Sequence, residues 1–358
     1  MSKIVSIGTA LPAYCHRQSD ILQFMQLVYA SNDVDRRKLR FLYSQGGIDQ
    51  RYSVIGDYSR PAADWKFYPQ TENLEPFPSL ETRMALFNRF APQLSVDAIR
   101  NCLEGVAHAK DITHLITVSC TGMSAPGLDL QVMELLDLPK NIMRTSVNFM
   151  GCYAAIHALK LGDAFCRSDK DARVLIVCTE LCTLHFQREG TMDNIASSLL
   201  FGDGSAAVLM MGADATHSGL QVSGFHSEVL PNGKRDMAWE LSSSGFLMTL
   251  SGYVPELIEE DLDDIIERGL QRHQMNKADI SHWCIHPGGK RILEAITKSV
   301  GLQKEQLQHS YQVLQEHGNM SSATILFVLK RMLQEKPAKL FGAAFGPGLT
   351  VETFMATS

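Results

Sequence analysis

Apolar and polar positions along the chain fall into two kinds of segment that follow each other in turn. Nearly continuous apolar runs of strand length occupy 114–120, 173–180 and 206–212. Such runs are typical of strands that are buried on both faces. Between and around them, apolar residues recur at helical spacing in 95–109, 127–136 and 253–274. This alternation predicts an α/β protein with a largely buried sheet.

Parts of the pattern occur twice. Three segments of the first half resemble three segments of the second half, in the same order and at nearly the same separation: 111–114 with 279–282, 150–160 with 320–330, and 172–180 with 338–346. A repeat of this kind indicates a duplicated architecture. We therefore expect two similar halves, 1–215 and 216–358, each with strands and helices in the same order and facing each other across a pseudo-dyad. Equivalent helix starts would then converge.

The duplication changes the meaning of Cys152, which follows a glycine and precedes a helix-like run. Free cysteine is often a buried core residue, so this is one reading of Cys152. A cysteine in the first turn of a helix can also be a nucleophile, because the helix dipole and a neighbouring histidine lower the pKa of its thiol. His286, at the end of a strand and before Pro-Gly-Gly, is the candidate partner. Asn319 would lie beside the second helix start, near Cys152.

Cysteine, histidine and asparagine allow two chemistries. In a cysteine protease the asparagine orients the histidine. In the duplicated geometry both His286 and Asn319 would instead face a substrate carbonyl, where an amide N–H stabilises developing negative charge. That arrangement suits decarboxylation of a malonyl thioester, whose enolate could then attack an acyl group held on Cys152.

Composition narrows the class of protein further. The 358 residues are 45% hydrophobic and 20% charged, as in soluble globular proteins. A formal net charge of −6 argues against a nucleic-acid partner. No apolar run reaches the roughly 20 residues of a membrane span, and the first residues do not form a signal peptide. The eight cysteines sit in apolar runs, as reduced thiols do, which predicts a cytoplasmic protein.

Two competing motifs are weaker. Residues 202–207, Gly-Asp-Gly-Ser-Ala-Ala, match a dinucleotide-binding pattern, but the residues that follow predict a strand where that motif requires a helix. Ligand-type side chains in 178–185 and 282–286 lie among apolar neighbours typical of buried strands, so we expect no metal site.

Four motifs together resemble the type III polyketide synthases of the chalcone synthase superfamily: GCYAA at 151–155, IHPGG at 285–289, GNMSSATILFVL at 318–329 and AAFGPGLTVE at 343–352. The resemblance implies a homodimer with a thiolase-type αβαβα fold. It also implies coenzyme A thioesters as substrates and no cofactor. Cys152 would carry the acyl chain, while His286 and Asn319 would promote decarboxylation of malonyl-CoA. Repeated condensation would end in cyclisation to a pyrone or to a resorcinol- or phloroglucinol-type ring.

Further site residues follow from the resemblance. Phe201 matches a gatekeeper between the coenzyme A tunnel and the reaction cavity, Ser321 matches a cavity-lining position, and the loop with Gly346, Pro347 and Gly348 would shape the cavity floor. Trp239 falls where relatives have a glycine and Met248 where they have a second gatekeeper phenylalanine, which predicts a smaller or redirected cavity. The coenzyme A phosphates require cations, for which the candidates are Lys38, Arg40, Lys290 and Arg291.

Two other functions stay open at the level of sequence. One is a single condensation like that of ketoacyl synthase III, and the other is a non-catalytic acyl-binding dimer partner. A separate carrier protein could also supply the acyl group. The intact set of Cys152, His286 and Asn319 argues against the non-catalytic alternative.

Overall fold

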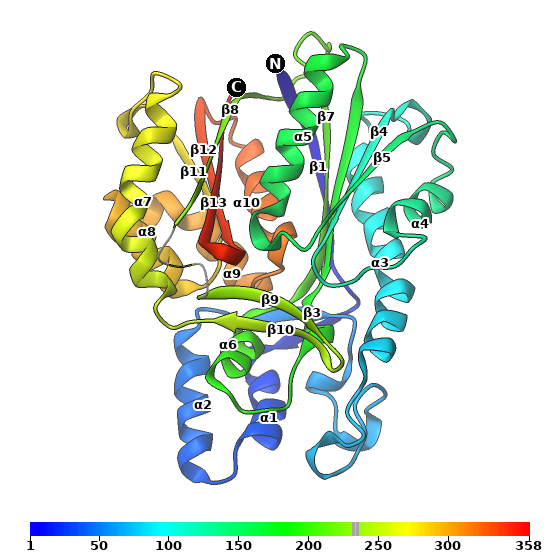
Figure 1. Ribbon diagram of the computed structural model, residues 1–358, viewed down its shortest axis with the longest axis vertical. Helices are drawn as coiled ribbons and strands as arrows, with labels where there is room; N and C mark the ends of the chain where they lie inside the picture. Colours follow the sequence, from blue (N-terminus) through cyan, green and yellow to red (C-terminus); the bar gives the residue numbers. More distant parts are fainter. Residues whose placement is uncertain (231–232, 234–235) are drawn as a thin grey trace.

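The computed structural model describes residues 1–230, 233 and 236–358, and Figure 1 shows how their helices and strands are arranged. Nine strands of these residues form one mixed sheet: β1 Ser2–Ala10, β4 His114–Ser119, β5 Met143–Asn148, β6 Arg173–Leu181, β7 Asp203–Gly212, β8 Leu220–Val229, β11 His282–Ile285, β12 Lys339–Gly346 and β13 Thr350–Thr357. Their order is β11-β12-β13-β8-β1-β7-β6-β4-β5. A short antiparallel pairing of β1 with β8 joins the strands of the first half to those of the second.

Helices form three layers around these strands. The inner layer is α5 Ala154–Ser168 and α10 Thr324–Leu333, and one core buries both against strands of the two halves. A second core lies under α1 Gln18–Tyr29, α3 Leu80–Leu103 and α4 Leu128–Leu135. A third lies under α7 Val254–Gln271, α8 Lys290–Val300 and α9 Gln308–His317. The order of the layers is outer helices, strands, inner helices, strands and outer helices. This order confirms the predicted layered α/β class.

The internal repeat of the sequence is also a repeat of structure. A 3-10 turn with a capping box precedes both β4 and β11, and a 3-10 turn opens both α5 and α10. β4 pairs in parallel with β6, and β11 pairs in parallel with β12. In both halves the strand that follows is antiparallel, as β7 and β13. The expected strand order is not fully repeated, because β5 has no counterpart strand between β11 and β12 in the described residues. The starts of α5 and α10 contact each other, as expected for equivalent helices.

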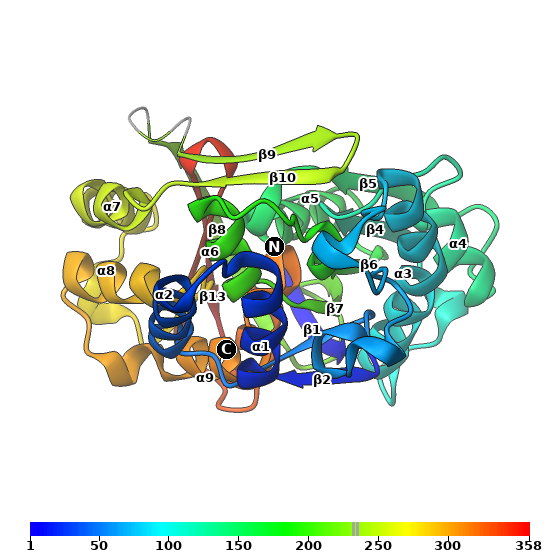
Figure 2. The same ribbon diagram turned by 90° about the horizontal axis from the view of Figure 1, so that it is seen from below.

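The remaining elements gather at one end of the sheet, below it in Figure 1 and nearest the viewer in Figure 2. They are α2 Asp33–Gln45, α6 Met192–Leu200, the pair β2 Tyr14–Arg17 and β3 Gln50–Ser53, and the hairpin β9 Met237–Ser242 and β10 Gly245–Leu250.

Two sequence predictions about elements can be compared with this fold. Helix α3 begins fifteen residues before the predicted start at 95, because Ser79 caps it by accepting a hydrogen bond from the Thr82 backbone N–H, and it ends at Leu103. Residues 203–207 open β7, so no helix follows the glycine-rich motif and the dinucleotide reading is excluded. Among the described residues, no helix combines the length and the apolar character needed to cross a membrane.

Candidate active site

Cys152 lies in the 3-10 turn Gly151–Tyr153 that opens α5. The turn depends on Gly151, whose φ is +76°. A Cβ atom on Gly151 would lie 2.1 Å from Cδ of Pro347, so the close approach of the two loops also requires glycine. The Cys152 Sγ is 3.7 Å from the Ser321 hydroxyl, which belongs to the corresponding turn of α10. The predicted convergence of the two helix starts is therefore present.

Asn319 is fixed from both sides. Its backbone N–H donates to the carbonyl of Leu200 at 2.9 Å, and its carbonyl accepts from the Gly202 N–H at 2.9 Å. Its side-chain Oδ1 accepts from the Ser321 N–H at 2.8 Å, while Nδ2 donates to the Gly288 carbonyl at 3.2 Å. These contacts set the orientation of the amide.

His286 follows β11 directly and is 1% exposed. Its backbone N–H donates to the Ala343 carbonyl at 2.9 Å. In the part of the chain that the structure describes, neither ring nitrogen has a hydrogen-bond partner. Burial lowers the pKa of the imidazole to about 3, so the ring is neutral. A buried polar group without a partner is costly, and this cost is characteristic of sites that bind a ligand.

Cys152, His286 and Asn319 line the same cavity of about 250 Å³. Phe201 and Met248 stand at one side of it. Most of the remaining wall is apolar, formed by Leu42, Ala196, Leu199, Leu200, Met237, Leu250, Val254, Pro255, Ile292 and Phe345. A thiol, an imidazole and an amide thus face one largely apolar space, in which electrostatic interactions are stronger than in water.

A second, smaller chamber of about 50 Å³ lies beyond Phe201 and Met248, which line both spaces. Trp239 lines the small chamber and pairs with Met248 across the β9–β10 hairpin. The indole Nε1 donates to the Cys120 carbonyl at 2.7 Å. His185 stacks on Phe246 with ring centroids 4.1 Å apart, and the Trp239 ring meets both rings edge-on. These rings occupy volume that a substrate would otherwise use.

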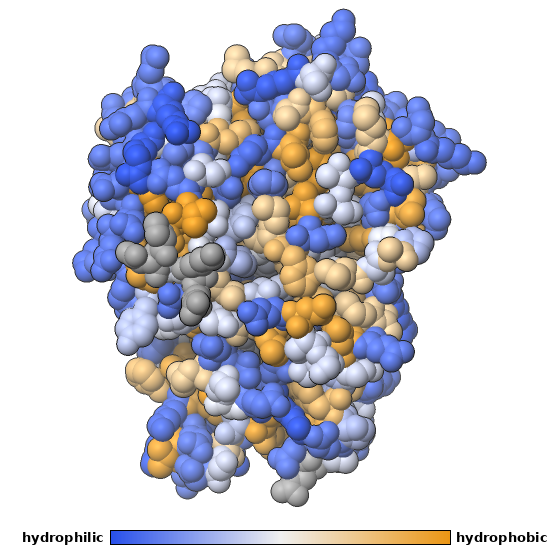
Figure 3. Space-filling model, viewed as in Figure 1, coloured by the Kyte–Doolittle hydropathy of each residue, from blue (hydrophilic) through white to orange (hydrophobic). Residues whose placement is uncertain are grey.

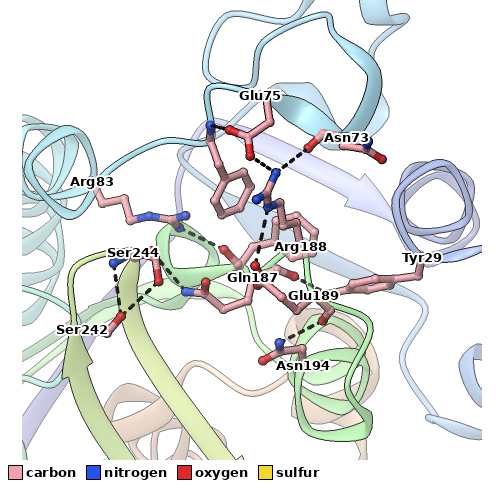
Figure 4. A network of polar contacts seen from close by, with 12 residues as sticks. Tyr29, Asn73, Glu75, Arg83, Gln187, Arg188, Glu189, Asn194, Ser242 and Ser244 are labelled. Atoms are coloured by element: carbon pink, nitrogen blue, oxygen red, sulfur yellow. Dashed lines mark hydrogen bonds and ion pairs between the residues drawn. The ribbon is translucent and has the colours of Figure 1, made fainter.

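The loop after β6, which supplies one wall of the small chamber, is held by the network in Figure 4. Arg83 donates to the carbonyls of Leu184 and Phe186, and Tyr29 donates to the Gln187 carbonyl at 2.6 Å. The Gln187 amide donates to the Ser244 carbonyl of the β9–β10 turn at 3.3 Å. The network therefore fixes the loop and the hairpin relative to each other.

The pKa of the Cys152 thiol differs from the sequence-based expectation. Burial raises it to about 12, and the side-chain contacts with Ser321 and Asn319 offset only part of this rise. The position of Cys152 at a helix start does not keep the thiol ionised, because an apolar cavity disfavours an isolated charge. Cys152 is therefore protonated at neutral pH. It needs a proton acceptor, and His286 faces the same space.

Six of the expected cavity residues divide into two groups. Phe201, Trp239 and Met248 line one or both chambers. Gly346, Pro347 and Gly348 line neither chamber. Gly346 and Pro347 pack against the Cys152 turn, where a Cβ on Gly346 would lie 2.6 Å from Cδ1 of Tyr153, and the preceding residue, Phe345, lines the large cavity. That this loop shapes the cavity floor stays a prediction. Ser321 likewise contacts Cys152 without lining either chamber.

The expected cations are placed unequally. Lys290 and Arg291 line the large cavity, and Arg291 pairs with Glu256 at 2.8 Å. Lys38 and Arg40 are exposed on α2 and do not line it. From that helix, Leu42 and Gln45 reach the cavity. Within the described ranges, no group of three or more metal-ligating side chains is assembled.

Comparison with known proteins decides the family. Profiles of the N-terminal and C-terminal domains of chalcone and stilbene synthases match residues 1–215 and 221–358. The chain belongs to this family. It is a type III polyketide synthase and therefore an acyltransferase.

The relatives are similar over the whole chain. A chalcone synthase-related protein of Bacillus subtilis (strain 168) is 32% identical, and the match covers 99% of this chain and 98% of the relative. The structure of PKS-I from the brown alga Ectocarpus siliculosus has a TM-score of 0.94 at 25% identity, covering 100% and 98% of the two chains. The C-terminal type III domain of a type I/III hybrid from Dictyostelium has a TM-score of 0.92 at 27% identity, covering 100% and 99%.

Proposed function

We propose that this polyketide synthase condenses malonyl-CoA repeatedly onto an acyl-CoA starter carried by Cys152. The observation that carries the proposal is the convergence of Cys152, His286 and Asn319 on one largely apolar cavity. In this proposal residues 1–215 form the half with the nucleophile, and residues 216–358 form the half with the histidine and the asparagine.

Loading requires a proton acceptor, because burial keeps Cys152 protonated. His286 is neutral and has two unpartnered ring nitrogens among the described residues, so it can take the thiol proton. The sulfur then attacks the thioester carbonyl of the starter. The bond from that carbonyl to the sulfur of coenzyme A breaks, and coenzyme A leaves with the proton from His286.

Extension begins with malonyl-CoA in the same cavity. Loss of carbon dioxide leaves an enolate, whose oxygen accepts hydrogen bonds from His286 and from the amide of Asn319. The enolate carbon attacks the Cys152 thioester, a carbon–carbon bond forms, and the cysteine sulfur leaves. The product is a chain longer by two carbons on coenzyme A, which reloads onto Cys152 or cyclises to a pyrone or a resorcinol- or phloroglucinol-type ring. No cofactor takes part in this scheme; the coenzyme A thioesters are the substrates.

Product size should be limited by the small chamber. Trp239 and the rings around it leave about 50 Å³ beyond Phe201 and Met248. Trp239→Ala removes an aromatic wall, so we expect longer or differently cyclised products from the same starter. Trp239→Phe keeps most of the volume and is the matched control.

Partners and location complete the proposal. We propose that Lys290 and Arg291, which line the large cavity, bind the coenzyme A phosphates, and that Lys38 and Arg40, exposed on α2, contribute to this binding. We also propose a homodimer. The face in Figure 3 carries a central band of apolar side chains between charged margins, and Met123 and Met143 are exposed large apolar residues.

We also propose a cytoplasmic location. All eight cysteines are free thiols, which suits the cytoplasm.

The test is mass spectrometry of products from purified protein, malonyl-CoA and a panel of aliphatic and aromatic acyl-CoA starters, with Cys152→Ala alongside. Tri- or tetraketides that vanish in the variant support the proposal. A single diketide formed from malonyl on a carrier protein indicates a ketoacyl synthase III-like enzyme. Acyl-CoA binding without any product from any starter contradicts the catalytic role of Cys152.

A further inference from the structure

The small chamber contains a buried cation that the proposed condensation does not use. Arg51, on β3, is 4% exposed and lines the chamber together with Phe201 and Met248. Burying a guanidinium is expensive unless its N–H groups find acceptors. The hydrogen bonds of Arg51 therefore show which of its N–H groups remain available to a ligand in the chamber.

Two of the three guanidinium nitrogens have partners. Nε donates to the side-chain oxygen of Gln18 at 3.0 Å, and Nη1 donates to the Phe201 carbonyl. Nη2 is buried, and none of the residues that the structure describes accepts a hydrogen bond from it. The arginine is thus anchored through Nε and Nη1, while Nη2 between them is free for an acceptor.

A second unused donor lies close by. The hydroxyl of Ser197 is buried, lines the same chamber and lacks a hydrogen-bond partner within 1–230, 233 and 236–358. Ser197 is one helical turn before Phe201, whose N–H donates to the Ser197 carbonyl at 3.1 Å. Arg51 and Ser197 therefore both flank the backbone of Phe201, one through its carbonyl and one through its N–H.

The charged groups around Arg51 do not use its free nitrogen. Asp203 is fully buried, and its two carboxylate oxygens accept from the Val54 N–H at 2.9 Å and from the N–H and hydroxyl of Thr183 at 2.8 and 2.7 Å. His16 has both ring nitrogens engaged, with Ser59 and with the Ile55 carbonyl. The Tyr43 hydroxyl also faces the guanidinium, but it pairs with the Ser198 hydroxyl at 3.2 Å and makes no hydrogen bond to Nη2. A ligand oxygen could therefore supply the acceptor that Nη2 lacks.

We propose that Arg51 and Ser197 form a subsite for an anionic oxygen at the far end of the acyl chain. The oxygen belongs either to a carboxylate carried by the starter or to the ionised enol of a β-ketoacyl chain. A chamber of about 50 Å³ accepts a few water-sized groups, which suits one carboxylate or one ketoacyl end. The proposal rests on the proposed function, since the chain must pass from Cys152 beyond Phe201 to reach the subsite.

The test compares thioesters that differ at the far end of the acyl group and share coenzyme A. Binding is measured by calorimetry with Cys152→Ala, so that no acyl transfer occurs. Succinyl-, glutaryl- and adipoyl-CoA are paired with butyryl-, pentanoyl- and hexanoyl-CoA, and acetoacetyl-CoA is the enolisable four-carbon ligand. At one chain length or more, we expect the anionic or enolisable ligand to bind about tenfold more tightly than its neutral counterpart.

Ser197→Ala is the decisive variant, because it removes no hydrogen bond between the described residues. It should reduce the tenfold preference to about threefold and leave the binding of the neutral thioesters unchanged. Ser223→Ala is the matched control, since its hydroxyl is also buried without a partner in the described chain but lies outside the chamber. Arg51→Met should abolish the preference, and thermal unfolding shows whether this variant has kept its fold.

The binding data distinguish a carboxylate on the starter from the ionised enol of the growing chain. A preference for the dicarboxylic series identifies a carboxylate starter, and a preference for acetoacetyl-CoA alone identifies the growing chain. Equal binding of every pair in the Ser197-containing protein overturns the subsite, as does an equal effect of Ser197→Ala and Ser223→Ala. Product formation by the protein with Cys152 intact is measured separately, so failure of the condensation and failure of the subsite are distinguishable.

Discussion

The starts of α5 and α10 occupy corresponding places in the two halves but differ in what they present. In each, a residue with positive φ precedes the second position of a 3-10 turn: Gly151 at +76° before Cys152, and Ser321 at +49° before Ser322. The Cys152 thiol faces the large cavity. Ser322 is 0% exposed, and its hydroxyl donates to the carboxylate of Glu180.

The difference originates in the strand opposite each turn. Glu180 near the end of β6 and Gly346 at the end of β12 occupy corresponding positions of the repeat. Glu180 accepts from Ser322 and also from the Cys120 N–H at 2.9 Å and the Thr121 hydroxyl at 2.8 Å. Gly346 has no side chain that could engage Cys152. A duplicated scaffold thus yields one turn tied to a carboxylate and one turn whose side chain is free to react.

Moving the thiol from the Cys152 turn to the Ser322 turn should abolish the reaction. Cys152→Ser should lower the rate of product formation by about a thousandfold or more, because the hydroxyl is a weaker nucleophile. Adding Ser322→Cys should restore nothing, since position 322 is fully buried and lines neither chamber. Product formation and intact-mass acylation with an acyl-CoA starter measure both. Acylation at 322 would show that the two turns are functionally equivalent.

Removing His286 tests how the free turn becomes reactive. Burial, together with the nearby Glu180 carboxylate, raises the pKa of Cys152 to about 12, so a thiolate needs the imidazolium of His286 as a counter-ion. With His286 present, we expect the rate of alkylation by iodoacetamide to level off at a lower pH than in His286→Ala. In the variant the rate should keep rising to the highest accessible pH, and at pH 7 it should be about a hundredfold lower. Identical pH profiles would exclude His286 as the proton acceptor.

The repeat could be predicted from the sequence because it consists of local residue patterns. Strand-length apolar runs and the paired helix starts are visible residue by residue, so Cys152 and Asn319 could be brought together without a structure. Arg51 and Ser197 could not be found this way: they come from β3 and α6, carry no motif, and meet only through the backbone of Phe201. The pKa of Cys152 was also beyond reach, because it depends on how completely the folded chain removes water around the sulfur.

Placing a methyl group on Gly346 should disturb the free turn while leaving the tied turn intact. A Cβ there would lie 2.6 Å from the Tyr153 ring and 3.3 Å from the Cys152 N–H nitrogen, so Gly346→Ala must shift the turn. We expect the rate of Cys152 acylation to fall about tenfold or more, measured in a single turnover by intact-mass analysis. Gly190→Ala is the control, because a Cβ there would meet only the Tyr29 ring, at an ordinary contact distance of 3.6 Å, and neither glycine has a left-handed backbone. If both variants lose acylation equally, the contact with Tyr153 is not the cause.

Removing the Ser322 hydroxyl, which ties the second turn to Glu180, should change the stability of the protein. Ser322→Ala removes one donor from the buried Glu180 carboxylate, which should lower the free energy of unfolding by about 1.5 to 3 kcal/mol. Ser310→Ala, equally buried but bonded to the neutral Ile285 carbonyl at 2.6 Å, should cost about 1 kcal/mol. Urea unfolding measures both.

The pH dependence of that loss shows whether the carboxylate is its cause. Burial already raises the pKa of Glu180 above 4.5, and the Ser322 hydroxyl is a contact that lowers it. Without the hydroxyl the folded-state pKa rises further, so the folded variant holds its proton to higher pH than the unfolded chain does. The stability of Ser322→Ala relative to the unchanged protein must therefore fall as the pH rises through the already raised folded-state pKa of Glu180, whereas that of Ser310→Ala stays level. A loss independent of pH would mean that Ser322 is held by packing, and the carboxylate would then not be what distinguishes the tied turn from the reactive one.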